Sequence, residues 1–391
     1  MRFTHPEQPG RSVRLAYCLN VHAAESFADL LAGLRSITIP LRERLGRADE
    51  PFGVGLYLSA KLVAELTRAP ELRAEVAQLF AAERLDPFTA NAFPYGGFHA
   101  GRVKEQVYAP IWGTRERLDY TLGVAGLLLE WLGPGRRLSI STHAGGWGAE
   151  IAKRGCAERA LAGLTVAQTS LAALAARRGS AVVLGIEAEP RSNANGTAAA
   201  AAIAARAGLS LCLDACHSAV EFEDPKKALE AALAPGPLAK LQFTSALALS
   251  DPGRSPAAWA ALLALDEPRY LHQATARTLK GLERWDDLDS LRGVDPRRLE
   301  EVRCHFHVPV DREELGGGLR TTRGQADLLL DLLLARPEDW RSDELHVEIE
   351  TYTWDVLPGE ARGPGTLVEG LEREYRHVLG RLERRGWTRG G

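Results

Sequence analysis

Short apolar segments rich in β-forming residues alternate with longer helical segments along almost the whole chain. The apolar segments are continuous rather than alternately apolar and polar, which is typical of parallel strands with both faces buried. Nine segments have this character, at residues 15–22, 52–58, 88–93, 138–143, 181–187, 209–215, 239–245, 304–310 and 345–352. Helical segments between them include residues 23–45, 60–82, 115–132 and 150–178. The pattern predicts an α/β protein whose parallel sheet is covered by helices.

A chain of 391 residues with this alternation favours a single (β/α)8 TIM barrel over residues 1–391. A doubly wound open sheet is the alternative, but no Gly-x-Gly-x-x-Gly turn follows the first strand. Nine strand segments exceed the eight of a barrel, so we expect one extra strand within residues 243–310. We interpret residues from about 246 to 303 as an insertion, with helical pieces at 256–265, 274–282 and 295–303. We also expect a C-terminal helix at 366–385.

Composition narrows the class of protein. The formal net charge of −3 argues against a partner that is nucleic acid or an anionic membrane surface. No run approaches the roughly 18 apolar residues that a transmembrane helix needs, and the first residues lack the apolar stretch of a secretory signal. The five cysteines are scattered and form no CxxC pair, so we expect neither a disulfide framework nor a zinc ribbon. We therefore expect a cytoplasmic protein without membrane insertion.

Polar side chains stand at the ends of two neighbouring predicted strands. Glu187 and Glu189 close segment 181–187 and, two residues apart, point to the same face. Two like charges there are costly unless a cation or hydrogen bonds offset them; the simpler alternative is a salt bridge to an arginine at the rim. Asp214 closes the next strand and His217 follows three residues later, so a carboxylate and an imidazole can approach one site. The alternative is that Asp214 only caps the following helix and His217 is solvated.

Two later strands add further candidates. His305 and His307 lie two apart on one strand, a pattern that indicates a divalent metal more often than a single histidine does. The last strand supplies Glu348 and Glu350, of which Glu350 is nearer the rim. Because barrel enzymes carry their catalytic groups at the carboxyl ends of the strands, we expect these residues to gather around one cation. Oxygen and imidazole ligands suit Mg, Mn, Co or Zn without discriminating between them.

Other polar residues near the predicted strand ends are candidates for substrate contacts. His22 ends the first strand, and the segment from Asn91 to His99, which includes Tyr95, is rich in hydrogen-bond donors. A satisfied loop histidine and an ordinary surface loop are the simpler alternatives. The candidate substrate-binding residues are His22, Asn91, Tyr95, His99, Glu189 and His305.

Several of these segments resemble a known superfamily. Ile186-Glu-Ala-Glu-Pro190, Leu213-Asp-Ala-Cys-His217 and Glu350-Thr351 resemble the metal-binding strands of the xylose isomerase-like TIM-barrel superfamily. That superfamily holds sugar isomerases and epimerases together with endonuclease IV-type enzymes. Within it, the chain is most similar to the EboE family, the metabolite traffic proteins of Ebo gene clusters. The resemblance covers most of the length and is most specific at residues 20–22, 91–99, 212–224, 266–273, 305–309 and 350–355.

The resemblance implies a divalent metal held by Glu, Asp, His and Glu. On this chain the first glutamate is Glu187, the aspartate is Asp214 and the last glutamate is Glu350. His217 matches a histidine that contacts substrate in these epimerases. The resemblance also implies that Glu187, Glu350 and His217 are the catalytic residues.

The chain departs from the superfamily's pattern at the third ligand. The strand expected to carry it reads Lys240-Leu-Gln-Phe-Thr, with Gln242 where histidine is common. Either Gln242 serves through its amide oxygen, or His305 or His307 replaces it. The candidate metal ligands are therefore Glu187, Asp214, Gln242, His307 and Glu350.

The function that the resemblance implies is metal-dependent proton transfer at a carbon next to a carbonyl, in the biosynthesis or traffic of a small metabolite. Its partners would be that metabolite and other Ebo-pathway proteins. A non-catalytic carrier that holds a metabolite at the barrel mouth is one alternative. An endonuclease IV-like hydrolase is another, but it would need more histidine ligands and a basic groove. A metal-free glycosidase would leave Asp214 and His217 without a role.

Overall fold

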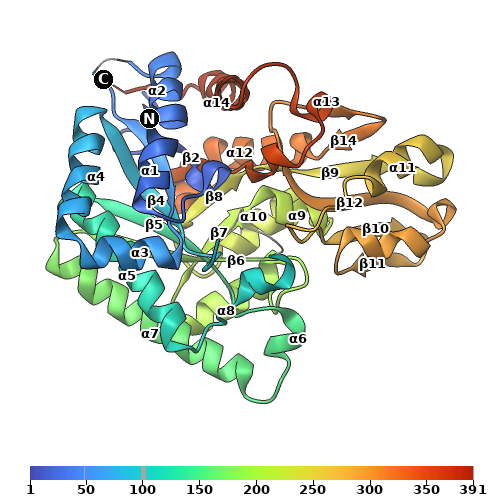
Figure 1. The fold of residues 1–391 in the computed structure, drawn as a ribbon, viewed down its shortest axis with the longest axis horizontal. Helices are drawn as coiled ribbons and strands as arrows, with labels where there is room; N and C mark the ends of the chain where they lie inside the picture. The colour runs from blue at the N-terminus through green and yellow to red at the C-terminus, as the bar shows by residue number, and fades with distance from the viewer. Residues whose placement is uncertain (48, 98–102, 391) are drawn as a thin grey trace.

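Eight of the nine continuous apolar segments close into a barrel (Figure 1). The computed structural model describes residues 1–47, 49–97 and 103–390. The barrel strands are β2 (Ser12–Cys18), β3 (Phe52–Tyr57), β4 (Leu85–Asn91), β5 (Arg137–His143), β6 (Ala181–Glu187), β7 (Ser210–Asp214), β8 (Lys240–Phe243) and β15 (Glu344–Ile349). Each strand is parallel to the next, and β15 pairs with β2 to complete the ring. The predicted (β/α)8 barrel is confirmed.

Helices follow the barrel strands and cover the outside of the ring. They are α1 (Phe27–Gly33), α2 (Ile39–Leu45), α3 (Ala60–Arg68), α4 (Pro70–Ala82), α5 (Arg115–Leu132), α6 (Gly148–Ile151), α7 (Cys156–Arg177), α8 (Thr197–Ala207), α10 (Pro225–Leu233), α12 (Arg323–Ala335) and α14 (Leu367–Arg384). The short helices α9 (Ala215–Val220) and α13 (Gly359–Arg362) pack mainly against strands outside the ring. The predicted helix at 60–82 divides before Pro70, which begins α4 because proline has no N–H to donate to the preceding turn. The predicted helix at 366–385 is confirmed as α14.

Between β8 and α12 the chain leaves the barrel and forms a second, antiparallel sheet, on the right in Figure 1. Its strands are β9 (Ser245–Ser250), β10 (Ala274–Thr278), β11 (Gly281–Trp285), β12 (Leu299–Val308), β13 (Glu314–Gly316) and β14 (Leu319–Thr321), in the order β11-β10-β12-β9-β14-β13. The sheet and α11 (Pro256–Leu263) bury an apolar cluster of their own. Because β9 begins two residues after β8 ends, this sheet grows from the carboxyl end of the seventh barrel strand.

Two of the three helices predicted for this region are not formed. Residues 274–282 form β10 and the start of β11, and residues 295–303 form a short 3-10 turn and the first half of β12. The Ala-, Leu- and Arg-rich composition favours helix locally, but Ala274 and Ala276 are completely buried in the second apolar cluster, and Gly281 adopts a positive φ of 115° at the turn. Tertiary burial therefore overrides the local propensity. The ninth apolar segment, 304–310, lies outside the barrel in and after β12, as the expectation of one extra strand required.

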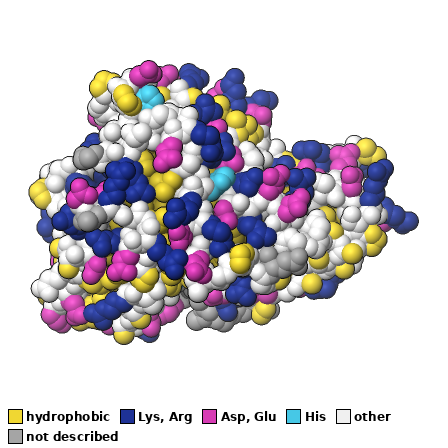
Figure 2. Space-filling model, turned by 90° about the horizontal axis from the view of Figure 1, so that it is seen from above, with side chains coloured by type: hydrophobic (Ala, Val, Ile, Leu, Met, Phe, Trp, Pro, Cys, Tyr) yellow, Lys and Arg dark blue, Asp and Glu magenta, His cyan; other side chains and the backbone are white. Residues whose placement is uncertain are grey.

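The two ends of the chain lie side by side next to the start of β2 (Figure 1). β1 (Arg2–Thr4) is antiparallel to the start of β2, and β16 (Thr388–Arg389) is antiparallel to β1. Acidic and basic side chains are interspersed over the face seen in Figure 2, as the small net charge leads one to expect. In the described ranges, no helix is long and apolar enough to cross a membrane.

Candidate metal centre

Three acidic side chains from three barrel strands meet at the carboxyl end of the barrel. Glu187 is the last residue of β6, Asp214 is the last residue of β7, and Glu350 directly follows β15. One carboxylate oxygen from each lies within 4.8 Å of those of the other two. Their exposed fractions are only 2–3%. Parallel strands of a barrel all end at the same side, so residues far apart in the sequence form one cluster there. Hereafter these three residues are the carboxylate cluster.

Asp214 has two roles in this arrangement. Its Oδ1 accepts a hydrogen bond from the backbone N–H of His217 at 2.8 Å and thereby caps α9, which was the simpler alternative from the sequence. Its Oδ2 is buried and has no hydrogen-bond partner among the described residues, and the same holds for Oε2 of Glu187. Buried carboxylate oxygens without a partner are costly, and a divalent cation is the kind of group that offsets that cost. The residues present therefore fit a metal ion with oxygen ligands.

The electrostatics of the cluster support the same interpretation. Burial raises the pKa of Glu350 well above its usual value, and the nearby charges of Glu187 and Asp214 raise it further. Burial also raises the pKa of Asp214, again with a contribution from Glu187. Carboxyl groups packed this closely compete for protons because two negative charges repel each other in a medium with little water. A divalent cation between them would remove that repulsion.

Glu350 is oriented by three amide groups. Asn20 donates to Oε1 at 2.6 Å, Asn91 donates to the same oxygen at 2.9 Å, and Gln242 donates to Oε2. The amide oxygen of Gln242 accepts from the Cys212 thiol at 2.8 Å. In this arrangement the side chain of Gln242 positions Glu350. That Gln242 is itself a metal ligand stays a prediction.

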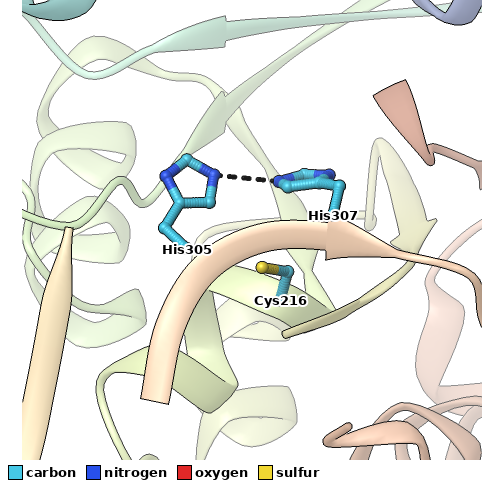
Figure 3. A group of neighbouring side chains, drawn as sticks. All are labelled: Cys216, His305 and His307. Carbon is cyan, nitrogen blue, oxygen red and sulfur yellow. Dashed lines mark hydrogen bonds between the residues drawn. The ribbon is translucent and has the colours of Figure 1, made fainter. Parts of the chain in front are cut away.

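Three histidines lie directly beside the carboxylate cluster. His217 comes from α9, whereas His305 and His307 come from β12 of the second sheet. Figure 3 shows the imidazoles of His305 and His307 on the same side of β12 with their ring edges facing each other, as the spacing of two residues predicts, and with Cys216 of α9 nearby. All three histidines are buried, with exposed fractions of 2–6%. The second sheet thus brings two imidazoles over the mouth of the barrel.

A cavity lies above these groups. Its lining includes the aromatic side chains of Phe93, Tyr108, Tyr270 and Tyr352. Residues of the carboxylate cluster and the three histidines also line it. Tyr108 donates to Oε2 of Glu189 at 3.1 Å, so this glutamate also faces the cavity. Burial raises the pKa of the Glu189 carboxyl to about 8, and the charge of Glu187 acts in the same direction. The lining also includes Lys104, whose ammonium pairs with Asp287 at 2.5 Å.

The structure does not bring every sequence-predicted residue to this cavity. His22 accepts or donates a hydrogen bond at 2.9 Å to the Tyr17 hydroxyl and is not among the residues that line the cavity. Tyr95 is likewise absent from the lining and packs its ring against Tyr120. His99 lies outside the described residues. Asn91, Glu189, His217, His305 and His307 do line the cavity, together with Glu187 and Glu350.

Sequence reasoning missed several cavity residues as site candidates. Asn20, Tyr108, Gln273 and Tyr352 all line the cavity, and the first of them binds Glu350 directly. Asn20 lies inside the predicted segment 15–22 and two residues after the end of β2, and that position at a barrel rim is the signal that could have found it. Gln273 comes from the second sheet, whose path over the barrel mouth no local pattern predicts.

A buried ion pair lies one layer below the carboxylate cluster. The Lys240 ammonium pairs with Oε2 of Glu348 and donates to the backbone oxygen of Ala90 at 3.1 Å, and both side chains are completely buried. Gly55 of β3 leaves the space that Glu348 fills, since a Cβ at this position would lie 1.8 Å from Oε1. The pair fills the barrel interior beneath the site and joins β8, which carries Gln242, to β15, which Glu350 directly follows.

Comparisons with known proteins agree with this fold. A crystal structure from Anabaena variabilis, named as a candidate sugar phosphate isomerase/epimerase, matches with a TM-score of 0.50 and 12% identity over 96% of this chain and 99% of that one. The IolI protein with a bound zinc atom matches with a TM-score of 0.49 and 13% identity, and D-psicose 3-epimerase in the presence of D-fructose with 0.49 and 12%; each covers 95% of this chain and 99% of the other. At such identities a likeness shows the fold alone.

No family model matches the chain, and no curated protein matches it either. The likeness to the Anabaena variabilis structure agrees with the (β/α)8 barrel fold. The finer resemblance to the EboE family stays a prediction.

Proposed function

We propose that the protein is a metal-dependent isomerase or epimerase that moves a proton at a carbon next to a carbonyl group. The observation that carries the proposal is the carboxylate cluster, in which buried oxygens of Glu187 and Asp214 have no hydrogen-bond partner in the described part of the chain. Three carboxylates at the carboxyl end of a barrel provide both ligands for a hard or borderline divalent cation and bases for proton transfer. The barrel fold shared with the Anabaena variabilis protein is compatible with this chemistry.

Each residue of the carboxylate cluster has a distinct task in this proposal. Glu187, Asp214 and Glu350 would hold the cation, which supplies Lewis-acid polarisation of the substrate carbonyl when bound. Glu187 and Glu350 come from strands on different sides of the cluster, so one carboxylate can remove the proton and the other can return it. Asn20, Asn91 and Gln242 keep Glu350 in place, and the aromatic walls keep water away from the carbanion-like centre that forms.

The cavity favours an uncharged substrate with an apolar part. Among the described residues, Lys104 is the lysine or arginine in the lining of the cavity, and its ammonium already pairs with Asp287. A phosphate group would therefore meet no unpaired lysine or arginine of the described lining, whereas Phe93, Tyr270 and Tyr352 offer apolar ring faces. We propose a hydroxy-carbonyl metabolite, handled in the cytoplasm with other Ebo-pathway proteins as the EboE-like motifs suggest.

Deuterium exchange tests the proposal without knowledge of the product. The full chain, loaded with Mn2+ or Co2+, would be incubated in D2O with D-fructose, D-psicose and the apolar hydroxyketone benzoin, and NMR would follow loss of the proton on the carbon beside the carbonyl. We expect exchange with at least one probe, and Glu187→Gln and Glu350→Gln should each lower its rate by about 100-fold or more. Glu71→Gln, an exposed change on α4, is the control. Undiminished exchange in both site variants would overturn the proposal.

The aromatic lining of the cavity also favours a second candidate, a carrier that holds a metabolite without converting it. Deuterium exchange together with a binding measurement separates the two functions. Saturable binding of benzoin, measured by quenching of tryptophan fluorescence, together with no deuterium exchange for any probe, would favour the carrier.

A further inference from the structure

Three imidazole nitrogens meet at one point beside the carboxylate cluster. The Nε2 of His217 lies 3.0 Å from the Nε2 of His305 and 3.1 Å from the Nε2 of His307. The Nε2 atoms of His305 and His307 lie 3.0 Å from each other. The three atoms therefore form a nearly equilateral triangle in a part of the protein that is almost completely buried.

The other ring nitrogen of each histidine faces an oxygen acceptor. The Nδ1 of His217 lies 2.9 Å from the backbone oxygen of Ala188, and the Nδ1 of His307 lies 3.0 Å from the backbone oxygen of Glu350. The Nδ1 of His305 lies 2.5 Å from the amide oxygen of Gln273. Because an oxygen acceptor needs a hydrogen from its partner, each Nδ1 carries the proton in the neutral ring, and each Nε2 carries a lone pair.

The side chain of Gln273 fixes this assignment for His305. Its NH2 group donates to the backbone oxygen of Pro190 at 3.1 Å, and a backbone oxygen can only accept. The amide oxygen of Gln273 must then point the other way, toward His305. Oxygen acceptors that hold the outer nitrogen of a histidine are the arrangement that orients metal-ligating imidazoles in proteins.

Three lone pairs that point at one another repel unless a positive charge lies between them. Nitrogens bound at 2.0–2.1 Å to a tetrahedral cation are about 3.3 Å apart, so the triangle needs to open by only a few tenths of an ångström. Two carboxylates flank the triangle. One oxygen of Glu189 lies within 4.8 Å of a ring nitrogen of His217 and of one of His305, and one oxygen of Asp214 lies within 4.8 Å of a ring nitrogen of His217 and of one of His307. The buried Oδ2 of Asp214 has no partner among the described residues, and Asp214 belongs to the group with His217 and His307 as well as to the carboxylate cluster.

We propose that His217, His305 and His307 bind a second divalent cation, distinct from the one in the carboxylate cluster. Three neutral imidazoles with a carboxylate as the fourth ligand suit Zn2+, Co2+ or Ni2+ better than Mg2+ or Ca2+. Asp214 is within reach of both clusters and can bridge the two cations. The role of the second sheet in this arrangement is to supply two of the three imidazoles, those of His305 and His307.

A proton is the competing occupant of the triangle. Burial alone would lower the pKa of His217, but the charges of Asp214, Glu189 and Glu187 outweigh it and raise the pKa well above its usual value. Burial keeps the pKa values of His305 and His307 well below theirs. An imidazolium at His217 could thus share a hydrogen with its two neighbours, and the experiment must separate a shared proton from a cation.

The test uses the full chain, stripped with a chelator and dialysed against Zn2+ or Co2+. Elemental analysis should give about two ions per chain, and the Co2+ form should show the intense visible absorption of a four-coordinate site. His305→Gln with His307→Gln should retain about one ion and lose that absorption. Glu187→Gln with Glu350→Gln should also retain about one ion but keep the absorption, so failure of this proposal is distinguishable from failure of the proposed function. His143→Gln, a buried histidine at the end of β5, is the matched control.

Two results would overturn the proposal. One is an unchanged metal content and Co2+ spectrum in the double histidine variant, provided that circular dichroism shows it to be folded. The other is a wild-type 15N NMR spectrum in which the three imidazoles keep a shared proton at saturating Zn2+. If the double variant does not fold, the single variant His305→Gln gives the answer: it should lower the affinity for Zn2+ by about 100-fold while leaving the Mn2+ affinity of the carboxylate cluster unchanged.

Discussion

At the scale of single residues, Asp214 shows how one side chain can serve both stability and chemistry. One of its oxygens caps α9, the other has no partner among the described residues, and the carboxylate belongs to both candidate cation sites. A capping residue at this position is explained by local structure alone, so capping cannot argue for or against a metal. A substitution that keeps the cap and removes the charge separates the two roles, because asparagine caps helices about as well as aspartate.

Asp214→Asn should therefore have opposite effects on metal binding and on stability without metal. Metal affinity should fall by more than the roughly 10- to 100-fold that loss of an outer-shell partner costs. In the presence of a chelator, the free energy of unfolding should rise by on the order of 1 kcal/mol, because asparagine lacks the charge whose burial raises the pKa of Asp214. Mn2+ titration and urea unfolding measure the two quantities. Asp214→Ala, which also removes the cap, should be less stable than Asp214→Asn by about 1 kcal/mol.

Two glycines provide a second test at this scale. Gly55→Ala would place a Cβ 1.8 Å from Oε1 of Glu348, so the buried Lys240–Glu348 pair would have to move. We expect a loss of about 3 kcal/mol or more in the free energy of unfolding. Gly126→Ala, inside α5 with nothing within 4 Å of the new Cβ, should instead gain about 0.5–1 kcal/mol. Equal effects of the two substitutions in thermal unfolding would contradict the assigned role of Gly55.

The sequence predicted the carboxylate cluster because its members end strands with clear local patterns. Glu187, Asp214 and Glu350 each follow an apolar segment directly, and a barrel brings such positions together. Asn20 and Gln273 could not be found in this way, since their roles depend on which side chains of distant segments they meet. The same limit applies to the meeting of His217 with the pair on β12.

At the scale of elements, β12 is the strand that joins the second sheet to the site. Its residues alternate between two surroundings: His305 and His307 face the barrel mouth, whereas Phe306 lies in the apolar cluster of the second sheet. The ring of Phe306 stacks on His272 with ring centroids 3.6 Å apart and planes at 4°. His272 in turn hydrogen-bonds the backbone oxygen of His305 at 2.9 Å. The strand is thus held from behind at the point where it presents its imidazoles.

Phe306→Leu should loosen this support. We expect the free energy of unfolding to fall by about 1–3 kcal/mol, because a leucine leaves part of the ring's volume empty. Zn2+ affinity of the three-histidine site should fall by about tenfold, while Mn2+ affinity of the carboxylate cluster should stay the same. Leu249→Ala, in the same apolar cluster on β9, is the control for general loosening of the sheet. An equal loss of Zn2+ affinity in both variants would show that the stacked pair has no specific part.

At the scale of the whole molecule, the barrel could be predicted and the second sheet could not. Eight continuous apolar strands at regular spacing define the barrel, and only the position of the ninth within residues 243–310 was predictable. The helices expected at 274–282 and 295–303 failed because those residues form strands. β10 pairs with its neighbour β11 and also with β12, and β12 pairs with β9, some 50 residues earlier. Strand propensity depends on the neighbours that a strand packs against, so pairing between distant segments is hard to predict from local sequence.

The acid–base behaviour of the whole chain gives the last prediction, centred on Glu374 of α14. This carboxyl is completely buried, accepts from Thr351 at 2.6 Å and from the backbone N–H of Val310 at 3.1 Å, and has a second oxygen without a partner among the described residues. Burial raises its pKa to about 8, and the charge of Asp311 acts in the same direction. The folded state therefore holds this proton between about pH 4.5 and 8, whereas the unfolded state releases it. The contribution of Glu374 to stability is largest at low pH and is lost as the pH rises through 8.

Because other buried groups titrate in the same range, the informative quantity is the difference between a variant and the wild type. The free energy of unfolding of Glu374→Gln, relative to wild type, should rise steadily from about pH 5 to pH 8 and then level off, by on the order of a few kcal/mol in total. Glutamine keeps the shape and both accepted hydrogen bonds but never carries a charge. Glu383→Gln, an exposed change on the same helix, should give a flat difference. Urea unfolding at each pH measures both, and a flat line for Glu374→Gln would mean that water or a movement of α14 relieves the buried charge.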